Sequence, residues 1–566
     1  MTQINECKQA RSSPRWGWPP NIAWAKPIIF AALMVAATFS VAQEHQHGDG
    51  EKLGSVNFAT SCNPDAQATF NRGVALLHSF QFSGAIEEFN SVLAQDASCG
   101  VAYWGISLSD WSNPFAPGLK DTTQLQLGLD AAQRGEQVGA KTERERAYMK
   151  AVAKLYVDFP NSPQRTRQLA YRDALSVLAS QYPDDHEAQI FYALALAAAE
   201  DPEDKTYAGR LKAGAILEKL FKEEPSHPGL AHYLIHTYDV PALASQALVA
   251  AQRYAEIAPD APHALHMPSH TFTRLGYWQE SIDSNIAAAA SARRQGQTAE
   301  ELHASDYEIY AYLQAGQDQA ARRIVDSLAE IASRFDPKQV IGGAGGPTAG
   351  YFALAAIPAR YALEREDWQQ AEQLAVHETP FPYTEAMTWF ARGIGASKLG
   401  HVSAANAAGQ VLKQIRERLV EANEPYWARQ VEIQHLVVLA WAELAAGKAQ
   451  RALATMQSAA QLEDGTEKSA VTPGPLAPAR ELLAEMLLQM RQPAQALRQF
   501  EATLGREPRR FRALYGAAHA AQLSGNRAAS QRYFGELRQV CARADEPARA
   551  EIQEARRNGA TRQSGP

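Results

Sequence analysis

The chain has few cysteines and no excess of positive charge. Its 566 residues include four cysteines, and its formal net charge is −7 at pH 7. Proteins that bind nucleic acids normally present a basic face, whereas the arginines here are scattered and form no long run with lysine. The composition therefore argues against a nucleic-acid partner. Motifs of the Gly-x-Ser-x-Gly and His-Glu-x-x-His kinds are also absent, which argues against a nucleophilic hydrolase of that class and against an ordinary zinc peptidase.

A phosphate-binding loop is lacking as well. The glycine-rich stretch Val340–Pro347 contains no Lys-Ser or Lys-Thr and follows no predicted strand, so we expect no nucleotide cofactor. We interpret residues 341–347 as a linker between helical hairpins. It is either a flexible hinge or a loop that covers a groove.

Long apolar runs are missing outside the N-terminus. Basic residues between Lys8 and Lys26 precede an apolar run from Ile28 to Val41, and Ser40-Val41-Ala42 provides the small residues that signal peptidase requires. We expect residues 1–42 to be a signal peptide and residues 43–62 to be a flexible, histidine-containing segment. The alternative is an uncleaved membrane anchor, for which the run is short. The prediction is a periplasmic or secreted protein that does not associate with the membrane after cleavage.

The few cysteines leave one pairing to consider. Cys62 and Cys99 bracket the first predicted hairpin and can form a disulfide in an oxidising compartment. Two buried free thiols would give the same sequence pattern, so both possibilities stay open. Cys541 would have no partner.

Most of the chain favours helix. It is rich in Ala, Leu, Gln, Glu and Arg, and few stretches alternate with a period of two. Turns of the Gly-x-x-x-x-Ala type, with a small residue five positions after the glycine, recur at Arg274–Ser281, Ala315–Ala321, Leu399–Ala405, Ala446–Ala452 and Ser524–Ser530. These turns resemble those of the tetratricopeptide repeat, a pair of antiparallel helices about 34 residues long. The resemblance implies an all-α solenoid of antiparallel helical hairpins over residues 63–340 and 348–541, and we expect a charged, disordered tail over 542–566. The whole chain resembles exported, histidine-rich bacterial tetratricopeptide proteins, a resemblance that carries no established reaction.

Histidines gather in one part of this predicted solenoid. Six of the 15 histidines lie between His227 and His270, and the pairs His232/His266 and His236/His270 are each separated by 34 residues. Because this spacing equals the repeat period, the same helix face should carry imidazoles in two consecutive repeats.

Helix positions refine the pattern. Pro228 suits the first turn of a helix, which places His232 and His236 one turn apart on one face. The resemblance implies that the first helices of successive repeats line a concave groove, where these two residues would form a square of imidazoles with His266 and His270. A third repeat, offset by 40 residues, places His303 and Asp306 opposite His263 and His266. Pro268 should kink the middle helix.

The pattern yields a set of candidate metal ligands. Imidazole and carboxylate suit transition metals, with zinc or copper favoured; the candidates are His232, His236, His263, His266, His270, His303 and Asp306. Two alternatives remain, namely a structural hydrogen-bond network and a ligand groove without metal. We expect an exported repeat protein that binds a peptide or protein partner in its groove and holds a transition metal. The alternative is a metal-dependent hydrolase or oxidoreductase, for which no catalytic residue is assigned.

Overall fold

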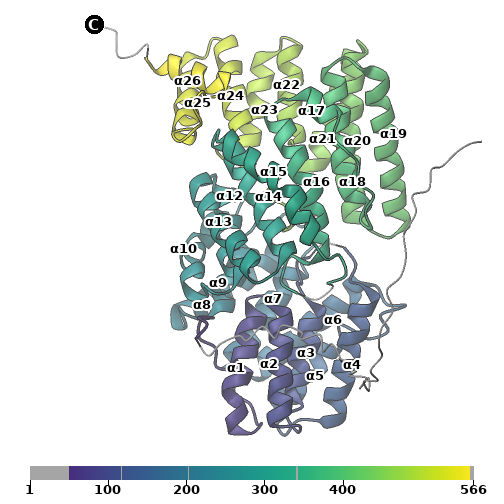
Figure 1. Cartoon of the computed structure of the whole chain (residues 1–566), viewed down its shortest axis with the longest axis vertical. Coiled ribbons are helices and arrows are strands. Elements are labelled where there is room, and N and C mark those ends of the chain that lie inside the picture. The colour runs from purple at the N-terminus through teal and green to yellow at the C-terminus, as the bar shows by residue number, and fades with distance from the viewer. Residues whose placement is uncertain (1–49, 117, 202, 340–341, 561–566) are drawn as a thin grey trace, which may run out of the picture. The chain divides into compact units, whose positions relative to one another are not determined.

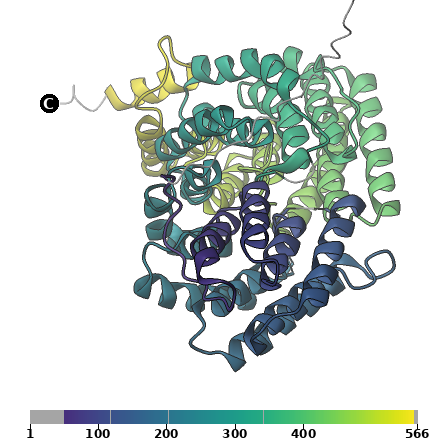
Figure 2. The same cartoon turned by 60° about the horizontal axis from the view of Figure 1, so that its bottom comes forward.

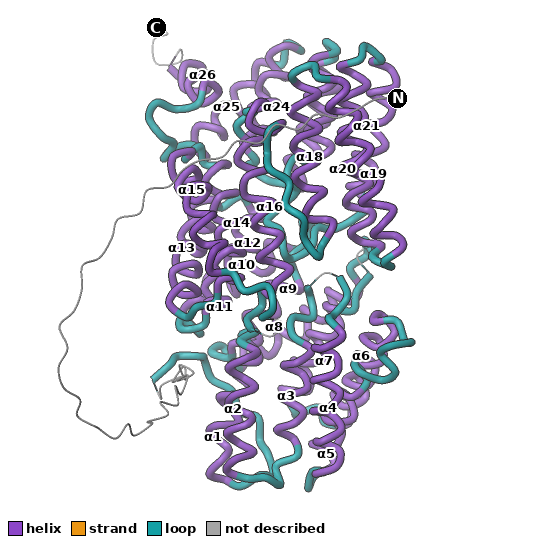
Figure 3. Tube along the Cα trace, turned by 45° about the vertical axis from the view of Figure 1, so that its right-hand side comes forward, coloured by secondary structure: helices purple, strands orange, loops and turns teal. Residues whose placement is uncertain are grey.

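The computed structural model describes residues 50–116, 118–201, 203–339 and 342–560. Over these ranges the chain consists of helices joined by loops, with no strand (Figure 3). These described residues belong to one compact unit. The expectation of an all-α, tetratricopeptide-like solenoid of antiparallel hairpins is confirmed.

The helices of the N-terminal half lead up to the glycine-rich stretch. They are, in chain order, η1 (Pro64–Ala66), α1 (Gln67–His78), α2 (Phe82–Gln95), α3 (Val101–Trp111), α4 (Thr122–Val138), α5 (Glu143–Ala153), α6 (Gln164–Gln181), α7 (His186–Ala198), α8 (Ala208–Glu223), α9 (Pro228–Thr237), η2 (Ala244–Ala247), α10 (Leu248–Ile257), α11 (Pro262–His266), α12 (Pro268–Leu275), α13 (Trp278–Arg294), α14 (Thr298–Gln314) and α15 (Asp318–Arg334).

The helices of the C-terminal half follow it. They are α16 (Gly346–Glu364), α17 (Trp368–Glu372), α18 (Pro382–Lys398), α19 (Val402–Glu421), α20 (Pro425–Ala445), α21 (Ala449–Asp464), α22 (Ala479–Gln489), α23 (Pro493–Arg506), α24 (Phe511–Leu523), α25 (Arg527–Val540) and α26 (Ala550–Ala560).

Glycines in the left-handed region turn the chain between paired helices. The predicted turn glycines all have positive φ, between 69° and 80°, at Gly276, Gly316, Gly400, Gly447 and Gly525. Glycine adopts this region without the steric cost that a Cβ brings. Each turn joins helices that pack against each other, such as α20 with α21 and α24 with α25.

Three consecutive hairpins carry the histidines. Helix α9 packs against α10, α11 and α12 pack against α13, and α14 packs against α15. In Figure 1 these teal helices lie between the purple and blue hairpins of the N-terminal half and the green and yellow hairpins of the C-terminal half. Figure 2 shows the N-terminal hairpins brought forward.

The expectation of a flexible segment over 43–62 is wrong for residues 50–62. Leu53 and Phe58 are buried, and the Phe58 ring stacks on Trp104 with 5.1 Å between ring centroids. Ser55 N–H donates to the carbonyl of Ser226. Apolar side chains therefore fix this segment against α1, α3 and the start of α9. Residues 1–42, where we predict the signal peptide, and residues 43–49 lie outside the described residues.

The glycine-rich stretch does not separate two domains. Helices α14 and α16, on either side of it, pack against each other, and the described residues belong to a single unit. Ser83 N–H donates to the Gly342 carbonyl, and Asn113 Nδ2 donates to the Ala344 carbonyl. The described part, residues 342–345, is thus held against the N-terminal hairpins, and Gly346 already begins α16.

The expectation of a disordered tail from 542 is wrong as far as residue 560. Helix α26 packs against α25, with Ile552 and Ala555 buried. Arg549 pairs with Asp318, which fixes this end of the chain to α15. Buried apolar residues among the charged ones explain why this segment is ordered. The prediction of disorder considered only the high charge content and missed them.

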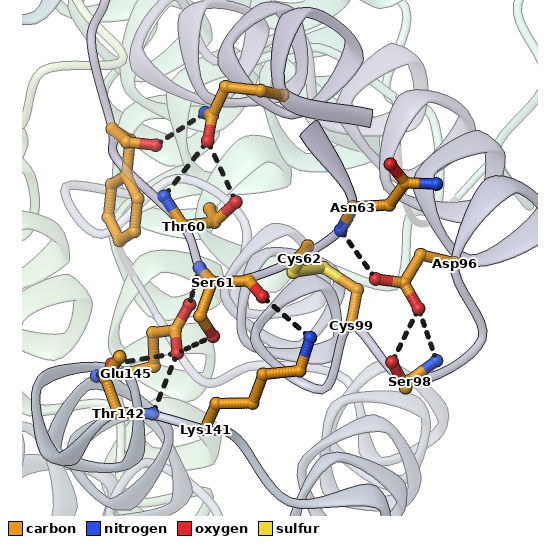
Figure 4. Close-up of a disulfide and its surroundings, with 12 residues drawn as sticks. Thr60, Ser61, Cys62, Asn63, Asp96, Ser98, Cys99, Lys141, Thr142 and Glu145 are labelled. Atoms are coloured by element: carbon orange, nitrogen blue, oxygen red, sulfur yellow. Dashed lines mark hydrogen bonds between the residues drawn. A yellow bond between two sulfur atoms is a disulfide. The ribbon is translucent and has the colours of Figure 1, made fainter. Parts of the chain in front are cut away.

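Of the two possibilities left open for Cys62 and Cys99, the structure has the disulfide (Figure 4). It joins the segment before α1 to the start of α3, and Lys141 Nζ donates to the Ser61 carbonyl beside it. Cys541 is free and buried. Among the described residues, no helix has the length and apolar character needed to cross a membrane.

Candidate metal centre

The six histidines proposed as ligands come from the first helices of three consecutive hairpins. His232 and His236 lie on α9, His263 and His266 on α11, His270 on α12 and His303 on α14. All six are at most 6% exposed. They form two groups of three, and within each group one potential ligand atom per residue lies within 4.8 Å of the others. We call them triad one (His232, His236, His263) and triad two (His266, His270, His303).

Triad one combines a pair on one helix with one histidine from the next hairpin. The His232 ring lies 4.9 Å from that of His236 and 5.0 Å from that of His263, measured between centroids. Phe80 and Phe115 pack against the imidazoles, the latter stacked on His236 with 4.2 Å between centroids. Aromatic rings therefore enclose the group on two sides.

Hydrogen bonds fix the tautomer of His232. Its Nδ1 lies 2.6 Å from the backbone carbonyl of His78, and because a carbonyl only accepts, Nδ1 carries the proton. Nε2 of His232 is then a bare lone pair, buried and without a hydrogen-bond partner. Nε2 of His236 and both ring nitrogens of His263 also lack partners. Buried polar atoms are nearly always satisfied, so three converging unpaired imidazoles fit a cation that binds lone pairs.

Hydrogen bonds also fix the tautomers of two histidines in triad two. His266 Nδ1 lies 2.7 Å from Asn285 Oδ1, and Asn285 Nδ2 donates to the Ser281 carbonyl, so the Asn285 oxygen must be an acceptor. His270 Nδ1 lies 3.0 Å from Asp239 Oδ2. Both Nδ1 atoms therefore carry protons, and the two Nε2 atoms, 3.1 Å apart, are both bare in the neutral imidazoles. Two lone pairs at that distance repel each other unless a proton or a metal ion satisfies them.

Asp239 is held in its ionised form. Burial would raise its pKa, but the charges of Lys468 and Arg274, together with the His270 hydrogen bond, keep the pKa well below its usual range. Arg274 Nε donates to Asp239 Oδ1 at 2.8 Å, and Lys468 Nζ donates to Oδ2 at 3.1 Å. A carboxylate that accepts from the far nitrogen of a ligand histidine orients the ring and increases its basicity.

Protons do not satisfy the bare nitrogens of His232, His236, His266 and His270 near pH 7. Burial lowers the pKa of His270 to about 4 and that of His303 to about 3. It also lowers the pKa values of His232, His236 and His266 well below that of free histidine. The neutral imidazoles are in the protonation state that binds metals.

The prediction that Asp306 faces the histidines is wrong. Its carboxylate accepts from Arg360 Nε at 2.7 Å, and both side chains are fully buried. The repeat offset correctly places Asp306 on α14, but the buried guanidinium of α16 neutralises it. The predicted square of four imidazoles is likewise replaced by two triads, completed by His263 and His303.

A third cluster joins His78, Glu187 and His227. Glu187 Oε2 lies 2.9 Å from His78 Nε2, and Oε1 lies 3.1 Å from His227 Nε2. His78 Nδ1 in turn bonds Tyr233 Oη at 2.9 Å. Because the facing atoms already pair with one another, this cluster fits a structural network that supports the His78 carbonyl next to triad one.

The histidines do not line an open groove as expected. A cavity of about 30 Å³ touches His236 and His263 of triad one and His270 and His303 of triad two. The rest of its wall consists of Asn113, Phe115, Ala116, Ala344, Gly345, Thr348, Ala349, Ala470 and Val471. Three loops and the start of α16 therefore cover the centre, and the cavity has room for a water-sized occupant.

Pro268 interrupts the helix as predicted. Helix α11 ends at His266 and α12 begins at Pro268. Proline has no N–H to continue the ladder, and the break lies between two residues of triad two.

Several supporting residues escaped prediction. Asp239 lies in the loop after α9 and pairs with His270, 31 residues away, so helical spacing gave no signal for it. Asn285 and Glu300 gave no signal, because their roles depend on the packing of α13 and α14. Glu300 Oε2 lies 3.7 Å from His263 Nδ1, and contact with His263 lowers the pKa of Glu300 although burial would raise it.

A larger cavity, of about 100 Å³, lies beside the centre among α20, α23 and the loop before α22. The Tyr383 ring stacks on Trp427 with 3.8 Å between centroids. Trp427 Nε1 and Gln434 Oε1, both on its wall, lack hydrogen-bond partners. Arg274 and Lys468 line the same cavity, so its wall is bonded through Asp239 to His270.

No protein-family model and no curated protein matches the chain. Among solved structures, the chain is similar to a human IFIT1 dimer with m7Gppp-AAAA, at 10% identity and a TM-score of 0.34 over 78% of this chain and 90% of that one. It is also similar to the APC/C hetero-tetramer Cut9-Hcn1, at 10% identity and a TM-score of 0.29 over 88% of this chain and 96% of that one. Likenesses at this level support no inference about function.

Proposed function

We propose that the protein is an exported metalloprotein that binds copper or zinc at its two histidine triads. The observation that carries the proposal is the convergence of three buried imidazoles in triad one whose Nε2 atoms have no partner. Leaving a buried polar atom unsatisfied costs about 1–3 kcal/mol, and a bound metal ion would remove that cost for all three.

The ligand count favours a reactive or ligand-binding centre over a purely structural one. Structural zinc is normally saturated by four protein ligands, whereas three ligands leave one position open. Each triad supplies three imidazoles, and the adjoining cavity provides space at the open position. A metal there would activate water or dioxygen, which supports the metal-dependent enzyme as the more specific reading.

Export is proposed on two grounds. The leader pattern of residues 1–42 predicts secretion, and the disulfide between Cys62 and Cys99 suits an oxidising compartment. Intact mass of the protein recovered from the periplasm tests this proposal, with a mature chain beginning at Gln43 expected. A full-length chain retained inside the cell would contradict it.

Elemental analysis tests metal binding. We expect wild-type protein, stripped and reconstituted with Cu or Zn, to retain metal after desalting, and the double variant His232→Ala/His266→Ala to lose it. The matched control is His401→Ala/His519→Ala, which removes two histidines whose side chains are 58% and 41% exposed. Absence of metal from the reconstituted wild type would overturn the proposal.

The melting temperature after metal removal by a chelator distinguishes a reactive metal centre from a structural one. Metal removal should lower the melting temperature only modestly if the metal serves chemistry, since the fold is built from hairpins that pack without it. A collapse of the fold on chelation would instead indicate a structural metal.

The larger cavity supports a second candidate, the binding of a peptide partner. Its unpaired donor, unpaired acceptor and aromatic wall at Trp427, Gln434 and Tyr383 are complementary to an extended backbone with an apolar side chain. We expect a tetrapeptide library to yield ligands for the wild type that bind Trp427→Phe more weakly, because that variant keeps an aromatic ring and loses the indole N–H. Retention of no peptide by the wild type would contradict it. The absence of a nucleic-acid partner stays a prediction.

A further inference from the structure

We propose that the two triads form one dinuclear copper centre in which a small oxygen ligand, hydroxide or dioxygen, bridges two copper ions within the shared cavity. This inference rests on the proposed metal binding and adds to it the number of ions, their identity and their cooperation.

The two triads lie next to each other. The His236 ring lies 5.6 Å from that of His270, and the His263 ring lies 5.8 Å from that of His266, between centroids. Ring separations inside the triads range from 4.4 to 6.5 Å. The gap between triads is therefore no larger than the gaps within them.

The two triads are built in the same way. Each triad consists of two histidines four residues apart on one hairpin and a third from the next hairpin along the chain. His263 completes triad one and His303 completes triad two. Two equivalent sites next to each other follow directly from the stacking of equivalent repeats.

Both triads line the same cavity. It touches two histidines of each triad and no side chain of Asp or Glu. Its walls are otherwise small or uncharged, at residues such as Ala344, Gly345 and Ala349. A volume of about 30 Å³ admits a bridging ligand of one or two heavy atoms.

Charge selects the ion. Imidazole binds a metal as a neutral ligand; of the nearby acids, Asp239 is already paired with Arg274 and Lys468, and Glu300, 3.7 Å from His263 Nδ1, adds at most one negative charge. By Coulomb's law two divalent ions repel each other four times as strongly as two monovalent ions at the same separation. The pair of sites therefore suits two Cu(I) ions, or two Cu(II) ions with an anionic ligand between them, and imidazole is a good ligand for both.

Anaerobic titration of stripped protein with Cu(I), in competition with a chromophoric chelator, measures the number of ions. We expect two Cu(I) per chain in the wild type and one in either His232→Ala or His303→Ala. One Cu(I) per wild-type chain would overturn the dinuclear centre while leaving metal binding intact. None at all, together with no zinc, would overturn the proposed function itself.

Electron paramagnetic resonance of protein loaded with two equivalents of Cu(II) tests the bridge. Coupling through a shared ligand should reduce the signal well below that of two isolated Cu(II) ions, and each single-triad variant should show the full signal of one ion. Full intensity for two ions in the wild type would overturn the bridge.

The variant Ala349→Leu places a larger side chain in the cavity wall without changing a ligand. We expect it to retain two copper ions and to recover EPR intensity, because the bridging ligand no longer fits. A signal as weak as that of the wild type would show that the bridging ligand lies elsewhere.

Discussion

His78 shapes triad one without contributing a ligand. Its backbone carbonyl accepts from His232 Nδ1, and its ring is fixed by Glu187 and Tyr233. Gly229, in the first turn of α9, allows this close approach, since a Cβ built there would lie 2.4 Å from His78 Nδ1.

The variant Gly229→Ala should therefore displace His78. We expect a loss of about 1–3 kcal/mol in stability from overpacking and weaker metal binding at triad one, measured by melting temperature and metal content. Gly505→Ala is the matched control, because a Cβ there meets no atom within 4 Å and alanine is the better helix former. Equal behaviour of the two variants would contradict the role of His78.

The buried histidines predict a pH dependence in the metal-free protein. Unfolded histidine has a pKa near 6.5, whereas burial lowers that of His303 to about 3. Between these values the unfolded chain binds more protons, so the neutral residue's contribution to stability decreases as pH falls below about 6.5. Carboxyls act in the opposite direction where burial raises their pKa to about 7, at Asp110, Glu308, Glu463 and Glu481.

A difference measurement isolates the histidine. These carboxyls are common to the wild type and His303→Asn, so their effects cancel. We expect the melting temperature of the metal-free wild type, relative to that of His303→Asn, to decrease between pH 7.5 and pH 5. A constant difference across this range would argue against a buried neutral His303.

For single residues, the sequence predicts the candidate metal ligands better than it predicts the side chains that pair with them. Six histidines could be identified because helical spacing and the repeat period follow directly from the chain. The partner of Asp306 could not, because Arg360 lies 54 residues away and only packing brings it near. The same holds for Lys468, 229 residues from Asp239.

Among the elements, the broken helix α11–α12 has the clearest bearing on the centre. Pro268 separates His266 from His270, and in the variant Pro268→Ala a new N–H could bond the carbonyl four residues earlier and straighten the segment. We expect at least tenfold weaker metal binding at triad two with no loss of helicity by circular dichroism. Pro358→Ala, which removes a proline inside α16, is the control. Unchanged affinity in Pro268→Ala would show that the break is incidental.

Helical hairpins could be predicted from turn chemistry, but the loops over the centre could not. The turn glycines have a local cause, the positive φ of the turn. The loop before α22 is held by non-local bonds, such as those from Tyr307 Oη to the carbonyls of Ala470 and Thr472. For that reason an open groove was expected where the structure has a covered centre.

Across the whole molecule, the disulfide fixes the N-terminal end of the solenoid. Cys62 and Cys99 are 37 residues apart, and closing a loop of that length stabilises by about 4 kcal/mol in the chain-entropy model. We expect a reducing agent to lower the melting temperature of the wild type and to leave that of Cys62→Ser/Cys99→Ser unchanged. A wild type insensitive to reduction would contradict a stabilising role.

The ion pairs that hold Asp239 also set when the centre can form. Lys468, 229 residues from Asp239, belongs to the loop before α22 that covers the centre. A chain still emerging during synthesis lacks that loop, so its histidines are not yet enclosed. Under the proposed metal binding, loading would therefore be a late event that belongs to the finished fold, and the environment in which folding ends would determine which ion the triads receive.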